Sequence, residues 1–183
     1  RSLNIGVSGI TDHAPIADPR QEIMEPTDRR LFAIYEYLRT DHTLKEIHGL
    51  SKIDPWFLSH LKTVVDMEKR LKEDPLNPEL IQSVKKLGFS DKAIGKIKKK
   101  TENAIRTLRL THNITPVVKQ IDTLAGEFPA ETNYLYTTYH GTEHDVTRSK
   151  KPPIIILGSG PYCIGSSVEF DLCAVNAARA IRS

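Results

Sequence analysis

Between residues 27 and 110 the apolar positions recur three and four residues apart, the spacing of one face of a helix. No window in this stretch alternates apolar and polar residues as a half-buried strand does. The pattern predicts five or six short helices packed as an all-helical bundle. The positions that carry it are Leu31, Ile34, Tyr35, Leu38, Trp56, Phe57, Leu61, Val64, Val65, Leu71, Leu80, Ile81, Val84, Leu87, Ala93, Ile94, Ile97, Ala104, Ile105 and Leu108.

Polar residues that can cap a helix stand at the start of each of these segments. In Asp54-Pro55 the cap precedes a proline at the first helical position, where proline loses no hydrogen bond. We expect that helix to run to about Glu73, and the short helix before it to end at Gly49. The predicted caps are Thr27, Thr43, Asp54, Asn77, Ser90 and Thr101.

The two flanks of the helical stretch have different patterns. Residues 1–30 are punctuated by glycine and proline and predict a mostly extended connector. Residues 116–139 are richer in β-forming residues, and residues 140–152 indicate a linker. The unbroken aliphatic run 154–157 predicts a strand buried on both faces, followed by a glycine turn and a helix over 170–181. One strand and one helix cannot cover a sheet, so we expect the neighbouring strands to lie outside this sequence.

The composition is that of a globular protein, with 39% hydrophobic and 27% charged residues among 183. The net charge of +3 is too small to indicate nucleic acid by itself, and no run approaches the roughly 18 apolar residues of a membrane helix. The two cysteines, Cys163 and Cys173, fit neither a disulfide scaffold nor a zinc site and indicate reduced thiols of an intracellular protein. The start at Arg1, without methionine or a signal segment, suggests a piece of a longer chain.

Seven lysines between residues 85 and 100 are countered only by Asp91. A nucleic-acid site usually adds arginines and stacking aromatics, but this run contains only Phe89, which we expect to pack inward. Lysine is also the ordinary residue of solvated helix faces. The run therefore favours a solvated surface, and no nucleic-acid partner is expected.

A glycine-rich turn after the predicted strand contains Gly158, Gly160 and Gly165. It lacks the third glycine of the dinucleotide fingerprint and the Gly-Lys-Ser/Thr of the phosphate loop, so a structural turn is favoured over a cofactor site. His140 and His144 have ligand-like spacing, but no further ligand stands nearby, and no metal site is expected. The spacing of Ser, His, Asp and Cys supports no catalytic arrangement.

Five strings, in order along nearly the whole chain, together resemble the middle of the large chain of carbamoyl phosphate synthetase. The residues of these strings are similar to those of the eukaryotic branch of this family, which includes multifunctional pyrimidine-pathway proteins. The strings are Ile53-Asp54-Pro55-Trp56-Phe57-Leu58, Leu87-Gly88-Phe89-Ser90-Asp91-Lys92, Val118 to Ala125, Asn133-Tyr134-Leu135-Tyr136, and Leu157 to Tyr162 followed by Gly165 to Asp171.

This resemblance implies two homologous halves, each with an ATP-grasp site, that make carbamoyl phosphate from bicarbonate and ammonia or glutamine. It implies that residues 1–19 are the tail of the first ATP-grasp module with a connector, and that 20–146 are an all-helical oligomerisation domain. Residues 147–183 would be the linker and opening βα unit of the second half. The sites for ATP and for Mg or Mn are expected outside this chain, and a glutaminase domain or subunit is an expected partner.

In similar enzymes the glycine turn and the acidic residue after it border a passage for carbamate. By position, Ser167 and Glu169 would be wall residues here, although an acidic helix start by itself needs only the helix dipole as its explanation. Two residues depart from the family pattern. Cys163 replaces an arginine or other polar residue, and Leu172 replaces an aromatic residue.

Our first hypothesis is a non-catalytic scaffold that joins two catalytic halves and self-associates. Exposed apolar residues would mark its association surface, with Trp56, Phe57 and Leu61 as candidates. The alternative is a helical binding module, similar to ubiquitin-associated or helix-hairpin-helix modules, that uses the lysines for acidic partners. A free-standing nucleotide enzyme is disfavoured by the single βα unit. No membrane partner is expected, and the compartment would be the cytoplasm or, as for some members of the family, the mitochondrion.

Overall fold

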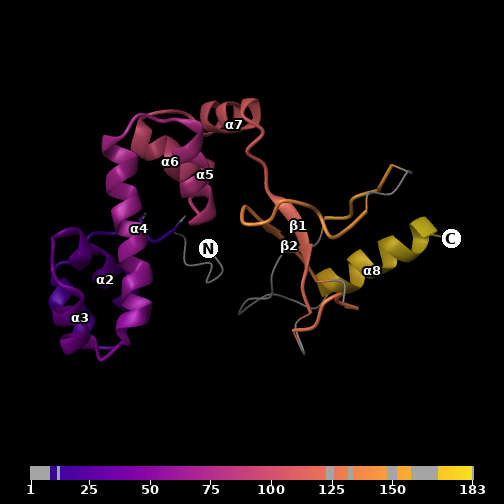
Figure 1. Cartoon of the computed structure of the whole chain (residues 1–183). Helices are drawn as coiled ribbons and strands as arrows, with labels where there is room; N and C mark the ends of the chain where they lie inside the picture. Colours follow the sequence, from indigo (N-terminus) through magenta and orange to yellow (C-terminus); the bar gives the residue numbers. More distant parts are fainter. Residues whose placement is uncertain are drawn as a thin grey trace. The chain divides into compact units, whose positions relative to one another are not determined.

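The computed structural model describes residues 9–11, 13–122, 126–131, 134–147, 152–157 and 169–182. The chain forms two compact units, residues 8–146 and a smaller unit that includes residues 147–183. The larger unit contains seven helices and one antiparallel hairpin in its described part (Figure 1). They are α1 (Pro19–Met24), α2 (Arg30–Arg39), α3 (Leu44–Ser51), α4 (Pro55–Glu73), α5 (Pro78–Lys86), α6 (Asp91–Lys98), α7 (Glu102–Thr111), β1 (Val117–Gln120) and β2 (Leu135–Thr138).

The prediction of a mainly helical chain is confirmed, with α2 to α7 as the expected run of short helices. The cap-then-proline starts of α4 and α5 form as predicted. The Trp56 N–H donates to Asp54 Oδ1 at 2.8 Å, and the Leu80 N–H donates to Asn77 Oδ1 at 2.8 Å. Such caps satisfy amides that have no partner inside the helix, so they fix where each helix begins.

Three predictions about the helices need correction: one helix was not expected, and two helix ends lie at other residues than predicted. The connector predicted over residues 1–30 contains α1, which Asp18 caps and whose Ile23 is fully buried. The short helix α3 continues past Gly49 to Ser51, because Lys52 takes the left-handed conformation that closes it. Helix α2 begins at Arg30 without a side-chain cap, since the Thr27 hydroxyl instead accepts from the Arg29 N–H.

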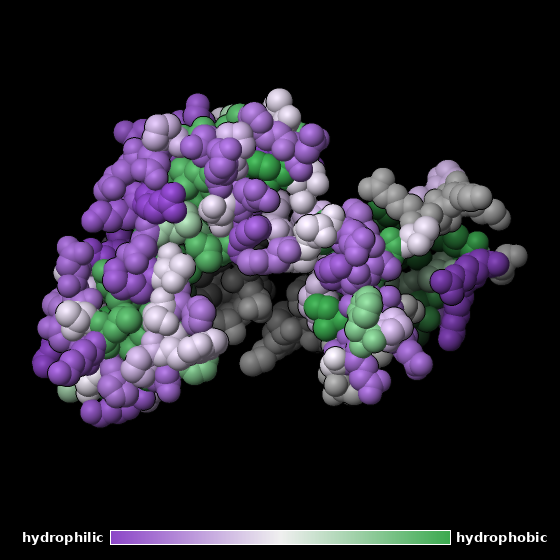
Figure 2. Space-filling view, in the orientation of Figure 1, coloured by the Kyte–Doolittle hydropathy of each residue, from purple (hydrophilic) through white to green (hydrophobic). Residues whose placement is uncertain are grey.

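Helix α4 is shared by two hydrophobic cores. Its first half packs with α1, α2 and α3, and its second half packs with α5, α6 and α7. Figure 1 shows α2 and α3 beside one end of α4, and α5 and α6 beside the other. In Figure 2 the visible face of these helices is mostly hydrophilic, with hydrophobic residues in patches between the hydrophilic ones. The buried members of the first core are Ile23, Ala33, Ile34, Tyr35, Leu38, Ile47, Leu58 and Val65. Those of the second are Leu71, Leu80, Val84, Phe89, Ile94 and Ile105, so Phe89 packs inward as predicted.

The β-rich stretch after the helices forms a hairpin in which β1 and β2 are antiparallel, with Val117 opposite Thr138. The chain after β2 returns along β1. The Val118 N–H donates to His144 Nδ1 at 3.0 Å, and Asp145 Oδ2 accepts from the Gln120 N–H at 3.0 Å. These hydrogen bonds therefore connect β1 to the segment that follows β2.

The smaller unit contains α8 (Glu169–Arg182). The strand predicted over residues 154–157 is wrong for this structure, which has neither helix nor strand there. Ile154, Ile155 and Leu157 are 69%, 78% and 90% exposed. A buried strand needs neighbours on both edges, and the described residues form no sheet besides β1–β2.

Candidate association surface and buried polar cluster

The first turn of α4 presents two aromatic side chains to solvent. Trp56 is 62% and Phe57 59% exposed, and their rings meet edge to face with centroids 4.9 Å apart. His60, one turn later, lies with its ring centroid 4.3 Å from that of Trp56. These three residues form what we call the aromatic patch. Because Asp54 and Pro55 fix the start of the helix, the positions of these side chains along α4 are fixed as well.

The three candidates from the sequence do not share one environment. Trp56 and Phe57 lie on the open surface, whereas Leu61 is half-buried and packs against the first core. Leu58, between them in sequence, is fully buried. The helical period of the sequence predicts Trp56, Phe57 and Leu61 on one side of α4, but contacts with α2 and α3 decide which residues reach the interior.

A buried ion cluster joins α5, α6 and α7. Lys85 Nζ lies 2.9 Å from Asp91 Oδ1, and Arg109 Nε lies 2.8 Å from Asp91 Oδ2. All three residues are less than a tenth exposed. Burial raises the pKa of Asp91, but the hydrogen bonds and positive charges of Lys85 and Arg109 outweigh that effect and hold the pKa below its usual value. Asp91 is therefore a charged residue that orients three helices.

The cluster corrects the interpretation of the lysine run as an entirely solvated surface, because Lys85 is buried. Lys98 is also engaged, since its Nζ donates to the Asp74 carbonyl at 2.5 Å. Others in the run, Lys86, Lys92, Lys99 and Lys100, are exposed. The basic face is thus smaller than the sequence suggests. Asp91, the one acidic residue within the run, was the signal that could have shown a buried ion pair.

A second buried polar group lies in the first core. The Tyr35 hydroxyl donates to Glu68 Oε2, and Lys72 Nζ lies 2.7 Å from Glu68 Oε1. Glu68 is 6% exposed, so its charge is paired where water is scarce. This contact links α2 to α4 and has a structural role.

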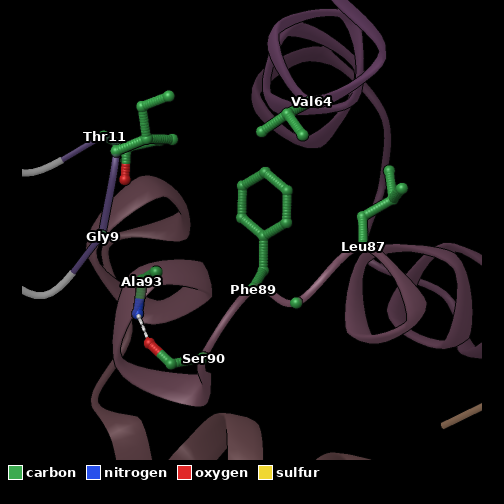
Figure 3. Close-up of a pocket in the computed structure, with 9 residues that line it drawn as sticks. Gly9, Thr11, Val64, Leu87, Phe89, Ser90 and Ala93 are labelled. Carbon is green, nitrogen blue, oxygen red and sulfur yellow. Dashed lines mark hydrogen bonds between the residues drawn. The ribbon is translucent and has the colours of Figure 1, made fainter. Parts of the chain in front are cut away.

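A small apolar pocket lies where residues 9–11 pass over the second core (Figure 3). The Phe89 ring points toward Val64 of α4, and Ser90 caps α6 by accepting from the Ala93 N–H. The pocket volume is about 80 Å³, whereas sites for small organic ligands usually measure about 300–1,000 Å³. The pocket is a packing feature and too small for a nucleotide.

A family model described as "Carbamoyl-phosphate synthetase large chain, oligomerisation domain" matches residues 1–113. The chain belongs to this family. A second model, the carbamoyl phosphate synthase preATP-grasp domain, matches residues 150–183. The resemblance stated from the sequence is therefore confirmed, and the helical unit falls within the oligomerisation model over most of its length.

Long relatives match the chain over most or all of its residues. The mitochondrial carbamoyl-phosphate synthase [ammonia] of Mus musculus is 44% identical over all of this chain and 13% of its own length. The mitochondrial arginine-specific large chain of Neurospora crassa is 50% identical over 88% of this chain and 14% of its own. Multifunctional protein CAD of Squalus acanthias is 45% identical over 93% of this chain and 8% of its own. The chain thus spans about a seventh or less of the length of these relatives.

Several residues that the resemblance to carbamoyl phosphate synthetase singled out lie outside the described residues. They are Gly158, Gly160, Cys163, Gly165 and Ser167. Glu169 is the first residue of α8, and Leu172 is 60% exposed on that helix. The carbamate-passage role of Ser167 and Glu169 stays a prediction.

The two histidines with ligand-like spacing have separate partners. His140 Nε2 lies 3.0 Å from the Lys86 carbonyl oxygen, and His144 Nδ1 accepts from the Val118 N–H. Among the residues that the structure describes, no three of His, Cys, Asp or Glu come together as a metal site would require. None of the described helices is long and apolar enough to cross a membrane.

Proposed function

We propose that residues 8–146 are a self-associating scaffold within a carbamoyl phosphate synthetase large chain and that the aromatic patch is the centre of the association surface. The observation that carries the proposal is the exposure of Trp56 and Phe57 on a domain whose family is described by oligomerisation. Large aromatic side chains are less frequent on the exposed surface of a protein than at the centres of protein interfaces.

Two aromatic residues per copy supply only part of an interface. A stable interface buries about 800 Å² on each partner, and each aromatic side chain buries about 150–250 Å². The polar neighbours on α4, Ser59, Lys62 and Thr63, would then form the rim around the patch. Such an arrangement, with a few aromatic anchors inside a polar border, is the usual distribution of binding energy.

In this proposal the catalytic work belongs to other parts of the large chain. The two synthetase halves would use ATP with Mg or Mn to convert bicarbonate and ammonia, or glutamine through a glutaminase partner, into carbamoyl phosphate. We assign no step of that reaction to the described residues. One relative is named as arginine-specific and mitochondrial, and others are named as the multifunctional proteins CAD and pyr-3. The pathway in this proposal is arginine or pyrimidine synthesis, and the compartment is the mitochondrion or the cytoplasm.

The test is the molar mass of the chain in solution, measured by light scattering over a hundredfold range of concentration. We expect the mass to rise from 20.6 kDa toward twice that value. Trp56 is the only tryptophan, so its fluorescence should shift to shorter wavelength over the same range. Phe57→Gln should weaken association at least tenfold, since losing a buried aromatic anchor costs about 2 kcal/mol or more.

The matched control is Leu110→Gln, which removes an exposed apolar side chain from α7 instead. This control should associate as the unmodified chain does. A monomer at every concentration, or equal loss from both variants, would contradict the proposal. Salt-dependent binding of ubiquitin or duplex DNA by the monomer would favour the helical binding module instead.

A further inference from the structure

The buried ion cluster contains one more positive than negative charge. The additional donors of its cations are used by carbonyl groups: Lys85 Nζ donates to the Phe89 carbonyl at 2.8 Å, and Arg109 Nη1 donates to the Ile114 carbonyl at 3.2 Å. Both carbonyls belong to the loops that follow α5 and α7. The excess charge is thus offset in part by the dipoles of these two backbone carbonyls.

The same cluster contacts the hairpin. Lys85 Nζ lies 5.1 Å from the ring centroid of Tyr139, the residue directly after β2, in cation–π geometry. Beside it, His140 Nε2 lies 3.0 Å from the Lys86 carbonyl oxygen. We call these two interactions the hairpin contact. Burial raises the pKa of Tyr139, which agrees with a phenol packed against the helices and not left in solvent.

The space next to the hairpin contact is not closely packed. A cavity of about 350 Å³ lies there, lined among others by Gln82 of α5, His112 after α7 and Thr142 of the loop. Its lining is largely polar. Since packed side chains do not fill this space, the hairpin contact is important for holding the hairpin on the helices.

The hairpin and its returning segment are well connected to one another. Lys119 Nζ lies 2.6 Å from Asp145 Oδ1, and the Asp145 N–H donates to the Val118 carbonyl at 3.0 Å. A methyl group on Gly141 would come within 2.5 Å of Val117 Cγ2, so the loop lies closely on β1. The hairpin strands β1 and β2 and residues 141–145 can therefore move as one body.

We propose that the hairpin contact is a releasable joint, which holds the hairpin against α5–α7 and can open while both the hairpin and the helices stay folded. The hairpin lies between the stretches matched by the two family models, residues 1–113 and 150–183. Within residues 8–146, the joint therefore determines whether the hairpin moves together with helices α5–α7. It does so through the Tyr139 ring on Lys85.

The test is ¹⁵N relaxation of backbone amides in the full chain. We expect hairpin amides to report the same rotational correlation time as those of α5–α7 in the unmodified chain. In Tyr139→Ala the hairpin amides should shift to a shorter correlation time than the helix amides, with the chemical shifts of β1 and β2 kept. Tyr139→Phe, which keeps a ring over Lys85, should behave as the unmodified chain.

Each other outcome would overturn the proposal. If the hairpin tumbles independently in the unmodified chain, the joint does not hold. If Tyr139→Ala leaves the correlation times equal, this contact is not what holds the hairpin. If strand chemical shifts disappear in Tyr139→Ala, the hairpin unfolds and does not move as a body. If Tyr139→Phe acts like Tyr139→Ala, the hydroxyl and not the ring makes the contact.

Discussion

At the scale of single residues, one glycine is required by a close approach of the backbone. A Cβ on Gly95 would lie 2.6 Å from the Lys100 carbonyl oxygen, because the chain turns back over α6 after its last residue. Lys99 makes that turn in the left-handed conformation, and the Lys100 N–H donates to the Gly95 carbonyl at 2.8 Å. The contact is with backbone, which cannot move aside as a flexible side chain can.

Gly95→Ala should therefore destabilise the protein, by about 1–3 kcal/mol, the usual cost of overfilling a packed site. Gly49→Ala is the matched control, since Gly49 is also helical but a Cβ there meets open space. It should stabilise the protein by about 0.5–1 kcal/mol because alanine is the better helix former. Urea denaturation measures both free energies of unfolding. Changes of the same sign in the two variants would contradict the argument.

At the scale of helices, the sequence predicts what local chemistry determines. Asp54-Pro55 and Asn77-Pro78 act within one turn of chain, so the starts of α4 and α5 were predictable. The same signal stands at Asp18-Pro19, where it begins α1. The glycines and prolines nearby predict a connector there instead. Asp91 indicates an ion pair within the lysine run, but local chemistry does not show which lysine is buried with it, because Lys85 and Asp91 become neighbours only when α5 and α6 pack together.

For the site, the sequence correctly indicated apolar residues at the start of α4. It could not separate the exposed Trp56 and Phe57 from Leu61, because the helical period is the same for all three. That separation depends on α2 and α3, which cover one side of α4. The hairpin contact was not predictable from the sequence either, because Lys85 and Tyr139 are distant in sequence and meet only in the folded chain.

Asp91 should make the free energy of unfolding of the helical part depend on pH in the acidic range. Its folded-state pKa lies below 3.8, so its contribution is complete above that pH and is lost as the pH falls through the lower folded value. Asp91→Asn should lose about 3–5 kcal/mol at pH 7, because two buried cations lose their partner. Below pH 4 the stability of this variant should fall less steeply than that of the unmodified chain.

The matched control is Asp66→Asn, which breaks an exposed pair with Lys62 on α4. Exposed ion pairs contribute about 1 kcal/mol or less, so this variant should stay close to the unmodified chain at pH 7. Urea denaturation from pH 2.5 to 7 compares the three proteins. An equal loss in both variants would mean that burial of the cluster contributes nothing beyond a surface pair.

At the scale of the whole molecule, the two units differ in how much apolar surface they cover. The larger unit buries two cores, whereas Ile154, Ile155 and Leu157 of the smaller unit are mostly exposed. An exposed aliphatic run outside any sheet of the described residues is a site at which another strand can add. The run lies within residues 150–183, which match the preATP-grasp domain, and the relatives of the chain are several times longer than the chain itself.

The rate of amide hydrogen exchange should differ between the two units. Amides of residues 154–157 should exchange near the rate of an unfolded peptide, since they have no secondary structure. Amides of Ile81 and Ile105, which are fully buried on α5 and α7, should exchange by orders of magnitude more slowly. Protection of residues 154–157 that grows with concentration would show that strands of two copies pair there. Association would then run through this segment, and the role of the aromatic patch on α4 would have to be given up if Phe57→Gln left that protection unchanged.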